Sequence, residues 1–229
     1  MHTPRPRMFA ALFAVSLLLA ACVGPLVSSP SRAAQSVAGQ GDVQRDELRG
    51  QALVDEMQRG GYVLYLRHGI TDRSQIDTGI LNGDRTLQCN LNEEGRVQSV
   101  EIGAALRTLG VPTDTVFAGP VFRARETAEL AFGPERVQIT DDLTADEYAG
   151  AQLPAVIAAT RAFLAQPPPS GNTVVVAHGG LLSLATNRGI RYTLPEGGTV
   201  VFQPLGAAGY RYIGSLPPDE LFALAAAAR

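Results

Sequence analysis

The sequence has 229 residues, 45% of them hydrophobic, and a formal net charge of −3. This length suggests one domain of ordinary size with additional segments, and the slightly acidic balance gives no electrostatic footprint for nucleic acid. All 19 basic residues are arginines, which excludes lysine chemistry such as a Schiff base or a P-loop lysine.

The first 21 residues have the build of a secretory signal peptide. Arg5 and Arg7 precede an apolar run, Met8 to Leu19, that is too short to span a bilayer. The run ends in Leu-Ala-Ala-Cys, which resembles the site at which bacterial lipoproteins are cleaved and lipidated. We therefore expect Cys22 to carry lipid and to anchor the protein to a membrane of the bacterial cell envelope, on the periplasmic or extracytoplasmic side. The alternative is a plain signal peptide with an incidental cysteine.

A composition change separates this segment from the rest of the chain. Residues 22–45 are rich in Ser, Gly, Ala, Pro and Gln and show no sustained period, so we predict a flexible tether. About 24 residues of such chain span on the order of 25–30 Å. Residues 46–229 are the predicted domain, and with Cys22 lipidated its only thiol is Cys89, which excludes an internal disulfide.

The domain alternates between predicted helices and strands. In chain order it begins with a helix at 46–59, a buried strand at 62–66, a long polar loop at 70–92, a helix from the Asn92 cap to Gly110, a strand at 114–118, a helix at 121–132 and a short strand at 137–140. It continues with a helix at 153–165, a strand at 173–177, a helix at 181–187, strands at 199–203 and 210–213, and a last helix from about 218. This order predicts a three-layer α/β/α sandwich with a largely parallel central sheet.

Two histidines hold matching positions in this pattern. His2 would be lost with the signal peptide, and His68 and His178 each directly follow a predicted strand and precede a glycine. Residues 119–123 follow a third strand. Ligands of open α/β sheets bind beyond the carboxyl ends of the strands, so we expect these segments to converge on one crevice. For a histidine considered alone, a structural role is the alternative.

An anion site fits these residues best. A zinc site needs three or four ligands, which no spacing here supplies, and Ser183 lacks a nucleophile elbow. Arg67, beside His68, offers a planar fork of donors that binds phosphate bidentately. A neutral imidazole in that field keeps a lone pair that can attack phosphorus.

Three motifs resemble those of the histidine phosphatase superfamily, also called phosphoglycerate-mutase-like. They are "LRHG" at 66–69, "GPVFRARETA" at 119–128 and "VVVAHGG" at 174–180, and the resemblance covers roughly residues 60–215. It implies that His68 forms a phosphohistidine, that Arg67 and Arg123 bind the phosphoryl oxygens, and that His178 donates to the phosphoryl group in the transition state. It also implies that Thr71 lies near the phosphate and that no metal or cofactor takes part.

The sequence departs from the family in two places. The family often has serine where Gly119 stands. The proton donor is also not obvious, because "DDLTADEYAG" at 141–150 lacks the usual flanking pattern. We favour Glu147 and Asp146 as general-acid candidates, with solvated loop charges as the alternative. Arg125 is predicted to have a structural or surface role. Arg85 is predicted to be a solvated loop charge, with contact to a second anionic group as the alternative.

The resemblance implies an envelope-tethered hydrolase of small phosphomonoesters, with no metal, cofactor or nucleic acid. Two alternatives stay open. A phosphomutase would return the phosphoryl group to product instead of water, although an export signal argues against glycolytic substrates. A catalytically idle protein would only bind an anion of the envelope, although a pure binder has no need of a nucleophile. The sequence does not identify the substrate.

Overall fold

A computed structural model describes residues 47–189 and 193–229. The predicted signal peptide, Cys22 and the predicted tether lie outside the described residues. Contacts divide the chain between Val43 and Gln44, and every element described below belongs to the second unit. In the described part of the chain, no helix is both long and apolar enough to cross a membrane.

A mixed sheet forms the centre of this unit. Within the described residues it has six strands in the order β3-β2-β4-β1-β5-β6. Their bounds are β1 (Val63–Arg67), β2 (Thr113–Ala118), β3 (Val137–Ile139), β4 (Asn172–Ala177), β5 (Thr199–Pro204) and β6 (Tyr210–Leu216). The first four strands pair in parallel, and β5 runs antiparallel to both of its neighbours. The sheet is therefore parallel except for one strand.

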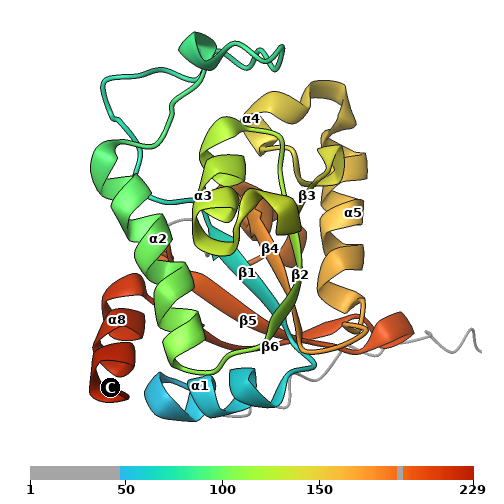
Figure 1. Ribbon diagram of the computed structural model, residues 1–229. Coiled ribbons are helices and arrows are strands. Elements are labelled where there is room, and N and C mark those ends of the chain that lie inside the picture. The colour runs from blue at the N-terminus through green and yellow to red at the C-terminus, as the bar shows by residue number, and fades with distance from the viewer. Residues whose placement is uncertain (1–46, 190–192) are drawn as a thin grey trace, which may run out of the picture. The chain divides into compact units, whose positions relative to one another are not determined.

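Helices cover both faces of this sheet, as Figure 1 shows. The helices that contribute to the first core are α1 (Gly50–Arg59), α2 (Glu93–Thr108), α3 (Phe122–Phe132) and α8 (Pro218–Ala227). The helices on the opposite face are α5 (Leu153–Ala165) and α6 (Gly179–Thr186). Between α3 and α5 lies the short helix α4 (Asp146–Ala149), followed directly by a 3₁₀ turn. This arrangement is the predicted three-layer α/β/α sandwich.

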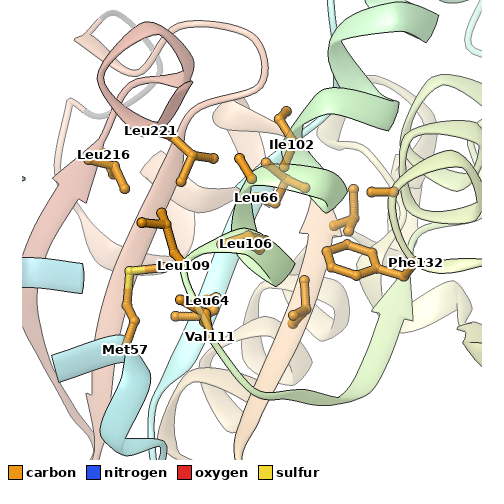
Figure 2. Close-up of a cluster of buried hydrophobic side chains, with 14 of the residues drawn as sticks. Met57, Leu64, Leu66, Ile102, Leu106, Leu109, Val111, Phe132, Leu216 and Leu221 are labelled. Atoms are coloured by element: carbon orange, nitrogen blue, oxygen red, sulfur yellow. The ribbon is translucent and has the colours of Figure 1, made fainter. Parts of the chain in front are cut away.

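The two cores follow from the alternation of side chains along each strand. In β1, Leu64 and Leu66 pack with α1, α2 and α8 in the first core, which Figure 2 shows. Val63 and Tyr65 of the same strand point into the second core, against α5 and α6. The central strand β4 is buried along its whole length, as its unbroken apolar run predicted.

The predicted elements agree with the structure except in three places. The first helix begins at Gly50 rather than at 46, because the backbone N–H of Leu48 donates to Ile213 and joins the sheet edge. The stretch 141–150, expected as a loop, contains two helical turns before α5. The last strand continues to Leu216. The loop at 70–92 is present and contains only one 3₁₀ turn, Arg85–Leu87.

Candidate active site

His68 stands at the carboxyl end of β1, and its ring is fixed from one side. Its Nδ1 lies 2.9 Å from the carbonyl oxygen of Gly69, which can only accept a hydrogen bond. Nδ1 therefore carries the proton of the neutral ring, and Nε2 keeps its lone pair. The residue is only 6% exposed.

His178 faces His68 from the end of the neighbouring strand β4. The two ring centroids are 5.2 Å apart, with the planes tilted by 54°. The hydroxyl of Tyr65 donates to the carbonyl oxygen of His178 at 2.9 Å and lies 3.2 Å from its backbone nitrogen. Both ring nitrogens of His178 are buried without a hydrogen-bond partner in the described residues. A buried, unsatisfied imidazole is costly unless a ligand completes it.

Burial and positive charge keep both rings neutral. Burial lowers the pKa of His68 well below its usual value, and the charges of Arg123, Arg67 and Arg73 lower it further, against a rise from the Gly69 carbonyl. Burial likewise lowers the pKa of His178, with Arg123 as the next cause. Burial disfavours the charged form of an imidazole, and a nearby cation acts in the same direction. Arg123 is the charge that affects both histidines most.

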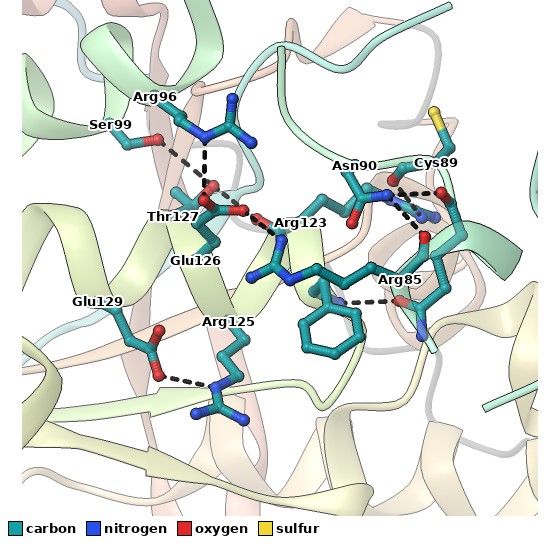
Figure 3. Close-up of polar contacts among 12 residues, drawn as sticks. Arg85, Cys89, Asn90, Arg96, Ser99, Arg123, Arg125, Glu126, Thr127 and Glu129 are labelled. Carbon is teal, nitrogen blue, oxygen red and sulfur yellow. Dashed lines mark hydrogen bonds and ion pairs between the residues drawn. The ribbon is translucent and has the colours of Figure 1, made fainter. Parts of the chain in front are cut away.

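Arg123 reaches the site from the first turn of α3 and is only 4% exposed. Thr127 links this turn to the segment after His68, since its hydroxyl donates to the carbonyl of Arg123 at 2.7 Å and accepts from the backbone N–H of Gly69 at 2.9 Å. The guanidinium donates from Nη1 to Asp77 at 2.9 Å and to the carbonyl of Cys89 at 3.3 Å. Figure 3 shows Arg123 together with Cys89 and Thr127.

Arg67 and Thr71 meet around a carboxylate that the sequence analysis did not single out. Nη1 of Arg67 donates to the carbonyl of Leu194 at 2.7 Å, and Nη2 lies 3.7 Å from Oε1 of Glu196. The Thr71 hydroxyl donates to the same Oε1 at 3.0 Å, and Arg73 donates to Oε2 at 2.7 Å. A cavity of about 510 Å³ opens beside Arg67, Arg73 and Glu196. Arg67, whose charge lowers the pKa of both histidines, and Thr71 are thus both bound to protein groups.

The two general-acid candidates have different surroundings. Glu147 is exposed on α4. Asp146 is half-buried, and its carboxylate lies against the first turn of α6, where a Cβ on Gly180 would collide with both of its oxygens. That position is two residues from His178, and the helix dipole favours negative charge there. No hydrogen bond between either carboxylate and His68 is found in the described residues, so their role stays a prediction.

The remaining predicted residues have clear structural roles. A Cβ on Gly119 would collide with the carbonyl oxygen of Leu143, so serine does not fit this turn. Arg125 pairs with Glu129 on the same helix at 2.7 Å, apart from the Cys89 segment in Figure 3. Arg85 pairs with Glu126 at 3.0 Å and lies over the ring of Phe122. The sequence predicted a structural or surface role for Arg125 but a solvated loop charge for Arg85, which instead makes these two contacts.

Three residues of the site were missed: Asp77, Tyr148 and Glu196. Each acts on a predicted residue through a long-range contact, and only the loop signal at 70–92 pointed toward Asp77. Among the described residues no group of three or more His, Cys, Asp or Glu side chains is placed to hold a metal ion.

Comparisons with known proteins agree with the motif analysis. A sequence model described as histidine phosphatase superfamily (branch 1) matches residues 63–154, which include His68 and Arg123. A comparison with curated proteins finds no match.

Several solved phosphatases have a similar chain course. Phosphoserine phosphatase from Entamoeba histolytica is 14% identical, with a TM-score of 0.48 over 70% of this chain and 98% of its own. A mycobacterial glucosyl-3-phosphoglycerate phosphatase is 17% identical, with a TM-score of 0.47 over 69% of this chain and 100% of its own. The protein histidine phosphatase SixA with tungstate is 16% identical, with a TM-score of 0.45 over 70% of this chain and 99% of its own. The segment that the model matches contains two of the three motifs, so over residues 63–154 the chain is similar to the histidine phosphatase superfamily.

Proposed function

We propose that the protein hydrolyses small phosphomonoesters through a phosphohistidine on His68. The family model that matches residues 63–154 supports the enzyme class, a phosphatase. The observation that carries the proposal is the buried histidine pair, with Nε2 of His68 holding a lone pair beside Arg123. A neutral, desolvated imidazole next to a fixed positive charge is suited to attack an anionic phosphoryl group, which the same charge attracts.

In the first step the Nε2 lone pair attacks phosphorus. The bond between phosphorus and the ester oxygen breaks, its electron pair leaves on that oxygen, and the departing alcohol takes up a proton. Asp146 and Glu147 are the candidates that would supply this proton. Arg123, Arg67 and a donating N–H of His178 would hold the phosphoryl oxygens as negative charge shifts onto them.

In the second step water attacks the phosphohistidine. The phosphorus–nitrogen bond breaks, its electron pair returns to Nε2, and inorganic phosphate leaves. The proton lost by this water returns to the group that protonated the alcohol. The Gly69 carbonyl holds the proton on Nδ1 in both steps, so the ring returns to its starting tautomer.

The proposal extends to metal independence and to location. The proposed nucleophile, phosphate-binding groups and proton donors are all side chains of the protein, so the proposed chemistry needs no Lewis acid in addition. The lipoprotein-like cysteine and the apolar run before it support anchoring to the bacterial cell envelope through lipid on Cys22. Substrates would then be small phosphomonoesters outside the cytoplasm.

The test is turnover of an aryl phosphomonoester by the purified full-length protein with a chelator present. We expect hydrolysis by the wild type, and none by His68→Asn, which keeps a polar side chain of similar size. Rapid denaturation during turnover should trap an acid-labile phosphate on the wild type and none on the variant. Turnover that depends on added metal, or an unchanged His68→Asn, contradicts the proposal.

The same preparation separates the two alternatives. A phosphomutase would pass the trapped phosphate to an added acceptor alcohol better than to water. An idle binder would bind vanadate saturably and show no turnover.

A further inference from the structure

Asp77 lies in the long loop at 70–92 and meets Arg123 inside the site. A single oxygen, Oδ1, accepts three hydrogen bonds: from Nη1 of Arg123 at 2.9 Å, from the backbone N–H of Cys89 at 2.9 Å, and from the hydroxyl of Tyr148 at 2.5 Å. These donors come from α3, from the loop itself and from α4. An acceptor held from three directions has little freedom to move.

The loop binds one nitrogen of the Arg123 guanidinium, Nη1, and leaves the other two nitrogens available. Both hydrogens of Nη1 are engaged, one by Asp77 and one by the carbonyl of Cys89. In the described chain no hydrogen bond is made by Nε or Nη2 of Arg123. These two nitrogens form the side of the guanidinium that can grip an oxyanion with two parallel hydrogen bonds. The loop therefore fixes Arg123 in the orientation that leaves a bidentate phosphoryl grip available.

We infer that Asp77 is the positioning residue of the phosphoryl site: it holds Nη1 of Arg123, with Tyr148 as its brace, so that the Nε–Nη2 side faces the ligand. This inference rests on the proposed function. It gives the loop a direct part in catalysis, because the loop delivers the carboxylate that orients the phosphate arginine. It also assigns a role to Tyr148, which touches Asp77 and whose ring lies 6.0 Å from the Arg123 guanidinium.

The surroundings of Asp77 distinguish this contact from an ordinary surface ion pair. The two carboxylates are similarly exposed, 25% for Asp77 and 27% for Glu129, but the Arg123 side chain is 5% exposed whereas that of Arg125 is 47% exposed. Burial by itself would raise the pKa of Asp77, but hydrogen bonds from Tyr148 and Cys89 and the charge of Arg123 outweigh it and lower the pKa. Asp77 is therefore ionised under ordinary conditions, and its bond to Arg123 is charge-assisted.

The rival explanation is that Asp77 only anchors the loop. A double-mutant cycle separates the two, because a residue that acts through Arg123 has nothing left to do once Arg123 is gone. We expect Asp77→Ala to lower kcat/KM for an aryl phosphate by roughly 100-fold, the scale on which a misplaced catalytic group costs activity. Asp77→Asn keeps an oxygen in the Oδ1 position and should recover most of that loss. In an Arg123→Ala background, Asp77→Ala should cause no further loss.

The matched control is Asp84→Ala, the same change in the same loop. Asp84 is exposed, and in the described chain its carboxylate accepts hydrogen bonds only from Thr86, so kcat/KM of the variant should stay within about twofold of wild type. The inference is overturned if losses at Asp77 and Arg123 multiply, if Asp77→Asn is as poor as Asp77→Ala, or if Asp77→Ala matches wild type.

The cycle also has a readout that does not need turnover. Binding of inorganic phosphate, measured by calorimetry, should weaken in Asp77→Ala only while Arg123 is present. If the wild type does not hydrolyse phosphomonoesters, the proposed function falls and the binding cycle still decides the inference. If the wild type does hydrolyse them and the cycle shows no coupling, only the inference falls.

Discussion

At His68, the proposed nucleophile, burial keeps the ring neutral, so the proposed mechanism needs no separate base to activate it. An exposed imidazole would be partly protonated near neutral pH, and its lone pair would be lost to that proton. Here burial and the charges of Arg123, Arg67 and Arg73 lower the pKa of His68, and the Gly69 carbonyl decides which nitrogen keeps its lone pair. In the proposed mechanism the same positive charges attract the phosphoryl group and keep the attacking nitrogen unprotonated.

This coupling predicts how activity depends on pH. The acid limb of kcat/KM reports the pKa of the free enzyme, and we expect it well below pH 6.5 because protonation of His68 removes the nucleophile. Arg123→Gln removes a cation that disfavours protonation of His68, so the acid limb should move to higher pH. The variant should also have a lower kcat/KM at every pH. Arg125→Gln, on the same helix but paired with Glu129, should leave the limb in place. The measurement is kcat/KM across roughly pH 4 to 8, and a limb that does not move in Arg123→Gln contradicts the explanation.

The sequence was informative about residues that follow strands and much less about their partners. His68, His178 and Arg123 could be found because strand ends converge at one edge of an α/β sheet. Asp77 and Glu196 could not, because each contacts its arginine from a segment without periodicity, and only the folded chain brings the carboxylates to the site. Hydrogen-bond partners across such distances are tertiary information.

At the scale of elements, the turn between β2 and α3 shows why one position of the second motif is glycine. The helical turn at 141–143 passes so close that the carbonyl oxygen of Leu143 occupies the space of a Cβ on Gly119. Close approach of two backbones is one of the conditions that require glycine. The turn between β2 and α3 sets the direction in which α3 begins, and therefore the position of Arg123 relative to the histidines.

Gly119→Ala should accordingly harm both stability and activity. We expect a loss of roughly 1–3 kcal/mol in the free energy of unfolding, the usual cost of overpacking, and a fall in kcat because the start of α3 must shift. Urea unfolding and aryl phosphate turnover measure the two effects. Gly189→Ala is the control, since a Cβ there meets nothing within 4 Å and should change stability by less than about 0.5 kcal/mol. If the Gly119→Ala protein is as stable as wild type, the turn at 141–143 moves away to accommodate the added methyl group, and the explanation is wrong.

Element by element, periodic segments were predicted well and short irregular ones were not. The bounds of α5 agree with the expected helix, and β4 begins one residue earlier than the predicted strand. Both carry an apolar pattern long enough to identify them. The four residues of α4 were missed because one turn of helix has no period of its own and is stabilised by tertiary packing.

At the scale of the whole molecule, strand order explains how the distant motifs meet. The strands β2, β4 and β1 are neighbours at the centre of the sheet and run in parallel. The segments that follow them therefore leave from one edge, and His68, His178 and the start of α3 lie together. The sequence predicted that the segments following the strands lie at the same edge of the sheet. It did not predict the order of the strands, because several orders are compatible with the same succession of helices and strands.

Placing two neutral histidines in the interior should make the whole domain sensitive to mild acid. In the unfolded chain both rings take up protons as the pH falls through about 6.5, while in the folded chain burial keeps their pKa well below this value. The unfolded state then binds more protons, so stability is full above that pH and is lost below it. Each histidine contributes a slope of about 1.4 kcal/mol per pH unit.

Urea unfolding at pH 7 and near pH 5 measures this slope before the carboxylates contribute. The two histidines together predict a loss of up to about 2.7 kcal/mol per pH unit in that window. Asp77 and Glu126, whose pKa values are lowered, add their own losses only at lower pH. His178→Asn removes one titrating ring and should reduce the slope by about half, whatever its effect on stability at pH 7. An equal free energy of unfolding at the two pH values would mean that the folded protein takes up as many protons as the unfolded chain, and the lowered pKa of His68 would be wrong with it.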